Sequence, residues 1–130
     1  MEKREDFYIP EEIAEWVSLK KSEYLSKLIQ IQGVGDIGFE EFHLYDRLIG
    51  GTIESPDKAF ESEEDQEVIR TYVKSYSERF NYHQVVVGVV LDDKERKANV
   101  FIPIITFVTK NVDVVKEFCV GEVITRPTLN

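Results

Sequence analysis

The chain has 130 residues, of which 42% are hydrophobic and 32% charged, and its formal net charge at pH 7 is −9. This length is typical of one domain and allows a hydrophobic core that needs no disulfide or metal. One cysteine, Cys119, excludes an intramolecular disulfide, and the N-terminal residues lack a signal-peptide core. No apolar run is long enough to span a bilayer. We therefore expect one domain over residues 1–130, in the cytoplasm, with no membrane partner.

The charge is distributed unevenly along the chain. Residues 1–67 contain 18 acidic and 7 basic side chains, whereas residues 68–130 contain 7 and 9. An acidic surface repels phosphate backbones, but a basic face on the second half would allow nucleic-acid binding. A solvated acidic surface that keeps the protein soluble explains the same imbalance.

Two helices are predicted in the first part of the chain. Pro10 suits a first helical position and acidic residues follow it, which predicts a helix over residues 11–32. A second helix is predicted over residues 39–49, with Gly50 and Gly51 ending it. The triplet Ser55-Pro56-Asp57 then predicts a turn.

The glycines of residues 33–38 match G-x-G-x-x-G. A dinucleotide site needs a strand before these glycines, and here a helix is predicted instead. A helix-hairpin-helix phosphate site fits the helical flanks, but Asp36, Glu40 and Glu41 give the turn the wrong charge. The sequence therefore favours a plain turn between two packed helices.

Residues 63–80 are compatible with two structures. Ser62 and Asp65 have capping-box spacing, and an acidic run surrounds them, which predicts a solvated helix start over residues 63–68. Residues 69–76 fit either a helix or a strand. A strand would present a row of alternating cations and aromatic rings on one side, namely Arg70, Tyr72, Lys74 and Tyr76. Such a row can pair with phosphates and stack on bases, whereas a helix would bury the tyrosines.

The second half of the chain predicts strands. An almost wholly apolar strand is expected over residues 84–91, followed by a charged hairpin loop over residues 92–99. A strand over residues 100–109 contains Pro103, which indicates an edge or a bulge. A short helix over residues 112–118 and a last strand over residues 120–125 complete an α+β fold. Its N-terminal helices are expected to pack on a mainly antiparallel sheet of three or four strands.

Metal and cofactor sites are not predicted. The only histidines, His43 and His83, have no ligand spacing around them. Cys119 lies in an apolar run and is interpreted as a small buried side chain.

A series of short motifs runs through most of the chain. In order they are His43 and Arg47, Thr52-Ile53-Glu54-Ser55-Pro56-Asp57, Ser62, Tyr72-x-Lys74-x-Tyr76, Val85-Val86-Val87, Ile105-Thr106-Phe107-Val108-Thr109-Lys110, and Lys116 with Gly121. This series, over residues 43–121, resembles the phage-associated branch of the barnase/colicin/RelE-like ribonuclease superfamily. The resemblance implies helices packed on an antiparallel sheet and cleavage of RNA without a metal.

Cleavage of this kind needs an acid or base and a cation at the phosphate. Carried onto this chain, the resemblance implies catalytic roles for His43, Lys74 and Thr106. It implies contacts with RNA or its phosphates by Arg47, Arg70, Tyr72, Tyr76, Thr109 and Lys110. RNA is the partner that these roles require.

The acidic first half supports a different function. A non-catalytic protein of the immunity or antitoxin type could use this charge to mask a basic protein partner, because complementary charge speeds association. A domain whose role the sequence does not reveal is the third alternative.

Overall fold

The structure is a computed structural model that describes residues 9–93 and 98–124. In chain order its elements are helix α1 (Glu11–Ile31), the 3-10 helix η1 (Phe39–Leu48), helix α2 (Ile49–Glu54), strands β1 (Lys58–Glu64), β2 (Glu67–Ser77), β3 (Asn81–Asp93) and β4 (Ala98–Thr109), helix α3 (Val112–Phe118) and strand β5 (Glu122–Val123). The five strands form one antiparallel sheet in the order β4-β3-β2-β1-β5.

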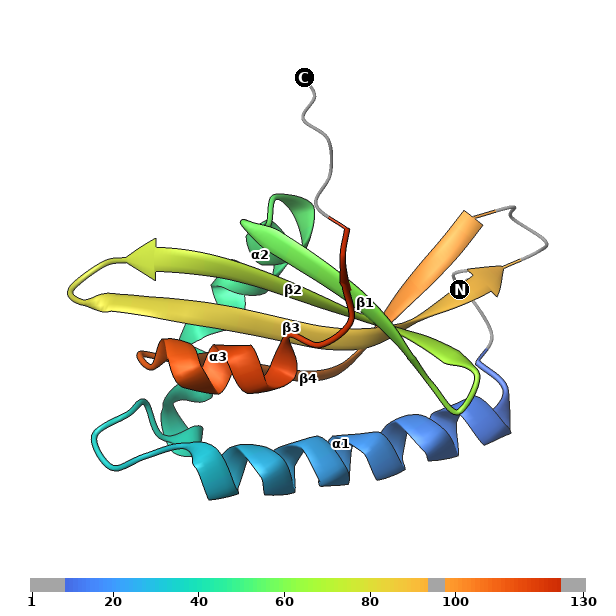
Figure 1. The fold of residues 1–130 in the computed structure, drawn as a ribbon, viewed down its shortest axis with the longest axis horizontal. Helices are drawn as coiled ribbons and strands as arrows, with labels where there is room; N and C mark the ends of the chain where they lie inside the picture. Colours follow the sequence, from blue (N-terminus) through green and yellow to red (C-terminus); the bar gives the residue numbers. More distant parts are fainter. Residues whose placement is uncertain (1–8, 94–97, 125–130) are drawn as a thin grey trace, which may run out of the picture.

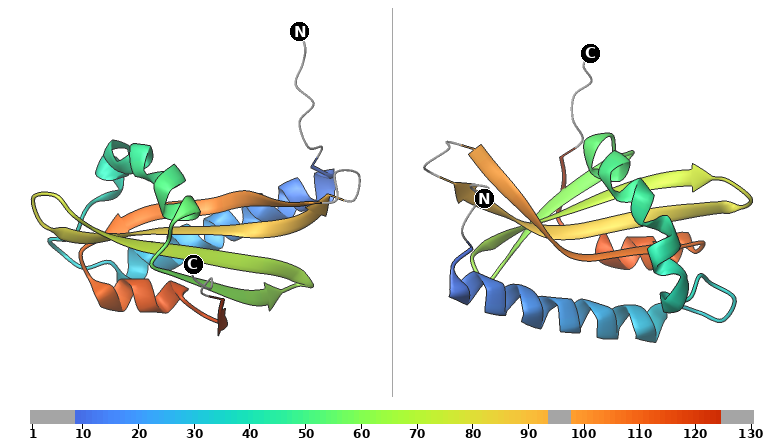
Figure 2. Two further views of the ribbon diagram at one scale, coloured as in Figure 1. Left: turned by 90° about the horizontal axis from the view of Figure 1, so that it is seen from above. Right: turned by 180° about the vertical axis from the view of Figure 1, so that it is seen from behind.

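Helices lie on both sides of this twisted sheet (Figures 1 and 2). Helices α1 and α3 lie against what we call the inner face. Elements η1 and α2 lie against the opposite, outer face, at the end of the sheet where β2 turns into β3. The predicted α+β class with N-terminal helices on an antiparallel sheet is confirmed, and the sheet has five strands.

The main core lies between the inner face and the two helices α1 and α3. Its buried members come from α1, the sheet and α3: Leu28, Ile69, Val73, Val85, Val87, Val89, Ile104, Ile105, Phe107, Val114, Val115 and Phe118. A second, smaller cluster of Ile37, Tyr82 and Val108 lies on the outer face beneath η1. Strand β3 is apolar along most of its length, and its residues Val85, Val86, Val87 and Val89 are buried on both of its faces.

The helix predicted over residues 63–68 is wrong. These residues belong to the β1–β2 hairpin, whose two turn residues, Asp65 and Gln66, have φ values of 53° and 69°. Positive φ at both central positions is typical of the tight turn that matches the twist of paired strands. Pairing with β2 thus outweighs the helical signal of the acidic run. Residues 69–76, which were compatible with either structure, form the centre of β2.

The second helix also differs from its prediction. Residues 39–48 form a 3-10 helix, and the glycines at positions 50 and 51 do not end the helical segment, because α2 continues to Glu54. Thr52 is fully buried, and its hydroxyl oxygen lies 3.0 Å from the carbonyl oxygen of Leu48. Tertiary contacts of this kind hold a segment helical even where its glycines are intrinsically poor helix formers.

The prediction for Pro103 is confirmed in both respects. Strand β4 is an edge strand, and the register between β3 and β4 shifts between Val87 and Gly88, opposite Pro103. The predicted loop over residues 92–99 is shorter, because β3 reaches Asp93 and β4 begins at Ala98, while residues 94–97 lie outside the described part. The helix over residues 112–118 is confirmed.

The remaining predictions concern the first helix, the glycine-rich connection after it, the last strand and Cys119. The first helix is confirmed, and the glycine-rich residues 33–38 connect α1 to η1. The last strand is short: Glu122 and Val123 pair with β1, and the N–H of Ile124 donates to the carbonyl of Ala59 at 2.8 Å. Cys119 is half-buried against the main core, and burial raises the pKa of its thiol to about 11, so the thiol is protonated at neutral pH.

Gly88 is a position where the bulge tolerates no side chain. A Cβ placed there would lie 2.5 Å from the carbonyl oxygen of Ile102 and 2.5 Å from the ring of Phe101. We expect Gly88→Ala to lower the free energy of unfolding by about 1–3 kcal/mol, as overpacking does. Gly50→Ala is the control, because a Cβ there meets nothing within 4 Å and a helical glycine is replaced by a better helix former. Urea denaturation measures both, and equal stability of the two variants would contradict the expectation.

Candidate functional site

The outer face of β2 carries the row of cations and aromatic rings that the strand alternative describes. Its members are all half-buried: Arg70, Tyr72, Lys74 and Tyr76. The residues between them point to the inner face, where Thr71 and Val73 are buried and Ser75 is exposed. The row divides into two parts, because η1 and α2 cover only one end of it.

Arg70 and Tyr72 lie at the end of the row that these helices leave open. The guanidinium of Arg70 donates through Nε to Glu61 at 2.8 Å and forms an ion pair with the same carboxylate. It also donates to the hydroxyl of Tyr72 at 3.2 Å. Burial opposes the charge on Arg70, but the hydrogen bonds to Tyr72 and Glu61 outweigh it and raise the pKa. The cation is therefore oriented, and its charge is largely balanced by Glu61.

Lys74 and Tyr76 lie at the covered end. The ammonium of Lys74 donates to the carbonyl of Ser55 at 2.8 Å, just after α2. In the part of the chain that the structure describes, no carboxylate forms an ion pair with Lys74. Its charge is consequently still available to an anionic ligand.

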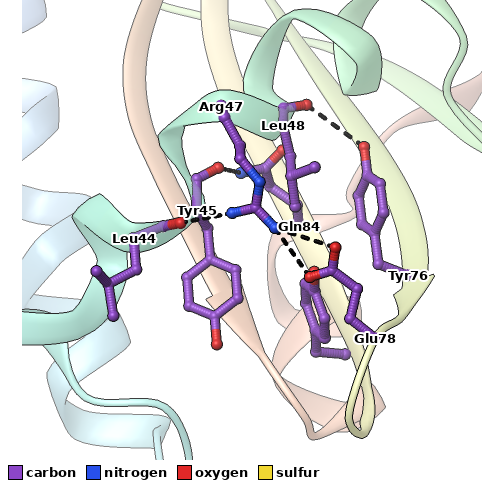
Figure 3. A network of polar contacts seen from close by, with 8 residues as sticks. Leu44, Tyr45, Arg47, Leu48, Tyr76, Glu78 and Gln84 are labelled. Atoms are coloured by element: carbon purple, nitrogen blue, oxygen red, sulfur yellow. Dashed lines mark hydrogen bonds and ion pairs between the residues drawn. The ribbon is translucent and has the colours of Figure 1, made fainter.

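A buried polar network attaches α2 and η1 to the sheet, and Figure 3 shows the contacts that Tyr45 and Leu48 of η1 make with Gln84 and Tyr76. The hydroxyl of Thr52 donates to Oε1 of Gln84 at 2.6 Å and lies 2.8 Å from the hydroxyl of Tyr76. Nε2 of Gln84 donates to the carbonyl of Tyr45 at 3.1 Å, and Tyr76 also reaches the carbonyl of Leu48. Thr52 and Gln84 are almost fully buried, so these bonds satisfy groups that water cannot reach. The hydroxyl of Tyr76 is thus engaged within the protein.

Arg47 and Glu78 form an ion pair at the same end of the sheet (Figure 3). Nη2 of Arg47 lies 2.9 Å and 3.0 Å from the two carboxylate oxygens of Glu78. The hydroxyl of Tyr82 donates to the same carboxylate at 3.1 Å. Burial and the bond to Glu78 raise the pKa of Tyr82 to about 12. The carboxylate of Glu78 thereby joins the hydroxyl of Tyr82 and the guanidinium of Arg47 in one cluster, although no sequence motif marked Glu78.

Lys110 lies beside the β2–β3 turn as well. Its ammonium is 4.9 Å from the centre of the Phe80 ring, a cation–π geometry, and both side chains are exposed. Thr109 is instead fully buried on the inner face, where its hydroxyl donates to Asp36. The same carboxylate accepts from the backbone N–H of Lys110 at 2.7 Å. Asp36 thus fixes the end of β4, and Thr109 has a structural partner.

His43 and Thr106 belong to different elements, η1 and β4. His43 is exposed on η1. Thr106 is half-buried on the outer face of β4, in line with Val86 and Tyr72 across two neighbouring strands. Two strand spacings separate Thr106 from Tyr72, which is about 10 Å. The structure therefore gathers Arg47, Lys110 and Tyr76 at one end of the sheet, and places Arg70, Tyr72 and Thr106 on the open part of the outer face.

An acidic corner forms where the first half of α1 meets the β1–β2 turn. Nε1 of Trp16 donates to Asp65 at 2.9 Å, and Lys20 lies 2.7 Å from the carboxylate of Glu64. The hydrogen bond to Glu64 raises the pKa of Lys20. The exposed carboxylates of this corner are Glu11, Glu12, Glu15, Glu63 and Asp65.

Among the described residues, no group of three or more histidine, cysteine, aspartate or glutamate side chains could hold a metal ion. None of the helices in residues 9–93 and 98–124 combines the length and apolarity needed to cross a bilayer. Comparisons with protein-family models, curated proteins and solved structures find no match for this chain. The function must therefore be inferred from the surface itself.

Two tyrosine variants test whether the outer face has one end engaged with η1 and α2 and another end that these helices leave open. Tyr76→Phe removes a hydroxyl that contacts Thr52 and Leu48, so we expect it to lower the free energy of unfolding by about 1 kcal/mol. Tyr72→Phe is the matched control on the same face of the same strand. Among the described residues its hydroxyl accepts a hydrogen bond from Arg70 alone, and Arg70 retains Glu61, so a change below about 0.5 kcal/mol is expected. Thermal unfolding measures both, and a larger loss for Tyr72→Phe would contradict this assignment.

Proposed function

We propose that this domain binds single-stranded RNA on the outer face of its sheet, as an RNA-binding or ribonuclease-like module. The observation that carries the proposal is that residues 69–76 form a strand, which places Arg70, Tyr72, Lys74 and Tyr76 on one face. Aromatic rings and cations on a sheet surface are a common arrangement for recognising unpaired nucleotides. The resemblance to the ribonuclease superfamily supports the same ligand.

The cations of the site fall into two groups, according to whether a neighbouring carboxylate compensates their charge. Arg70 and Arg47 are each held by a carboxylate, whereas Lys74 bonds a carbonyl and Lys110 lies over an aromatic ring. A phosphate gains most from a cation whose charge is not already compensated. Lys74 and Lys110 are therefore the phosphate contacts that this proposal requires.

Cleavage would need a proton-transferring group as well. His43 is exposed, so solvent and ligand can reach its ring. Near it in the chain, Arg47 orients the carboxylate of Glu78, which could serve as a base, while an arginine can stabilise a phosphate that gains charge. These three side chains form the catalytic part of the proposal.

Fluorescence anisotropy with a labelled single-stranded RNA at low salt, in the presence of EDTA, tests this function. Lys74→Ala and Lys110→Ala should each weaken binding and reduce the slope of log K against log salt by about 0.7. Lys21→Ala is the control, because it removes the same charge from an exposed site on α1. If the domain also cleaves RNA, His43→Ala should slow cleavage by about 10²–10⁴-fold with binding unchanged. Absence of RNA binding by the wild type would refute the proposal.

The acidic corner favours a second candidate, a non-catalytic domain that docks a basic protein. Glu63 at the end of β1 and Asp65 in the β1–β2 turn are exposed, beside the acidic first turn of α1. Complementary charge at such a surface would accelerate association. Anisotropy measurements with a labelled lysine-rich peptide and with labelled RNA distinguish the two candidates. A protein-docking domain would bind the peptide and lose that binding on Asp65→Lys. Adding it to the labelled RNA would not change the RNA's anisotropy.

A further inference from the structure

Two aromatic rings meet on the open part of the outer face. Tyr72 of β2 and Phe101 of β4 have ring centres 5.1 Å apart and an interplanar angle of 73°, an edge-to-face contact. Strand β3 runs between them, so the rings meet across a whole strand. Tyr72 and Phe101 form what we call the aromatic corner.

The β-bulge makes this contact possible. Gly88 lies on β3 opposite Arg70 on one side and Pro103 on the other. Because Gly88 has no side chain, the ring of Phe101 lies directly over its backbone, within 2.5 Å of where a Cβ would stand. Bulges commonly redirect a side chain next to a functional site. Here the bulge and the glycine together bring Phe101 towards Tyr72.

Packing of the core does not account for the aromatic corner. Tyr76, four residues further along β2, packs against the buried cluster under η1, but neither Tyr72 nor Phe101 packs against either buried cluster of the described residues. Both rings are half-buried, and their neighbours Val68 and Pro103 are exposed. Helices η1 and α2 lie at the other end of this face (Figure 2, right). The corner therefore remains accessible to a flat ligand.

The charge beside the corner is nearly balanced. The guanidinium of Arg70 holds the hydroxyl of Tyr72 and pairs with Glu61, so it extends the aromatic surface by a planar group without adding a free cation. Flat rings next to a planar guanidinium suit the face of a nucleobase, which stacks on aromatic side chains and on arginine planes. A phosphate would gain little here, since Glu61 already balances Arg70.

We propose that the aromatic corner of Tyr72 and Phe101 stacks one unpaired base of a single-stranded RNA. The inference rests on the proposed RNA-binding function and adds a division of roles within it. Lys74 and Lys110 hold phosphates, the corner holds a base, and Tyr76 supports the fold because its hydroxyl is engaged by Thr52. The corner thus contributes affinity that does not depend on salt.

The test compares a labelled single-stranded RNA of about twelve nucleotides with an abasic strand of the same length and charge. Phe101→Leu should weaken binding of the RNA by at least about fivefold, because base–aromatic stacking is lost. Its binding of the abasic strand and its salt slope should equal those of the wild type. Phe101→Tyr keeps the ring and should bind as the wild type does. Tyr72→Leu, from the other strand, should reproduce the effect of Phe101→Leu, and thermal unfolding confirms that each variant is folded.

The outcomes separate the inference from the function on which it rests. If the wild type binds RNA but folded Phe101→Leu and Tyr72→Leu bind it equally well, the base site is refuted and RNA binding stands. A loss that is equal for the RNA and the abasic strand also refutes stacking. If the wild type binds neither strand, both proposals fail, and binding of a lysine-rich peptide would then favour the protein-docking alternative.

Discussion

The antiparallel pairing of β2 with β3, from Val68 opposite Val90 to Ser77 opposite Asn81, is the constraint on which the rest of the structure depends. Side chains alternate along a strand, so this register sends Ile69 and Val73 into the core and leaves a row of polar and aromatic groups on the outer face. A slip of one residue would exchange the two sets. The burial of the core therefore also fixes the composition of the candidate site.

The two ends of the outer face differ in what their side chains contact: one end packs against helices, and the other carries accessible aromatic rings. At the end near the β2–β3 turn, a buried hydrogen bond between Thr52 and Gln84 attaches α2 to the sheet, and Gln84 also binds η1. At the other end, Gly88 removes a side chain and Phe101 takes its place beside Tyr72. The first end uses polar groups to stabilise the fold, since an unsatisfied buried group would be costly. The second end leaves its rings accessible to a ligand.

The sequence predicted the fold class, the first helix, the two long apolar strands and the role of Pro103, because these depend on local patterns. Strand β1 was hidden, since its acidic run is compatible with a solvated helix start and only its pairing with β2 makes it a strand. The predicted site residues lie at opposite ends and faces of the sheet, as Tyr72 and Thr109 show. Glu78 and Phe101 were missed because their roles depend on contacts between distant segments, which periodicity does not reveal.

The central claim is that single-stranded RNA binds the outer face of the sheet. Titration of the ¹⁵N-labelled protein with unlabelled RNA, followed through its backbone amide resonances, tests this claim most directly. The account predicts shift changes at Arg70, Tyr72 and Lys74 and at Phe101, with the first half of α1 unaffected. Changes confined to the acidic corner around Asp65, or no changes at all, would contradict it.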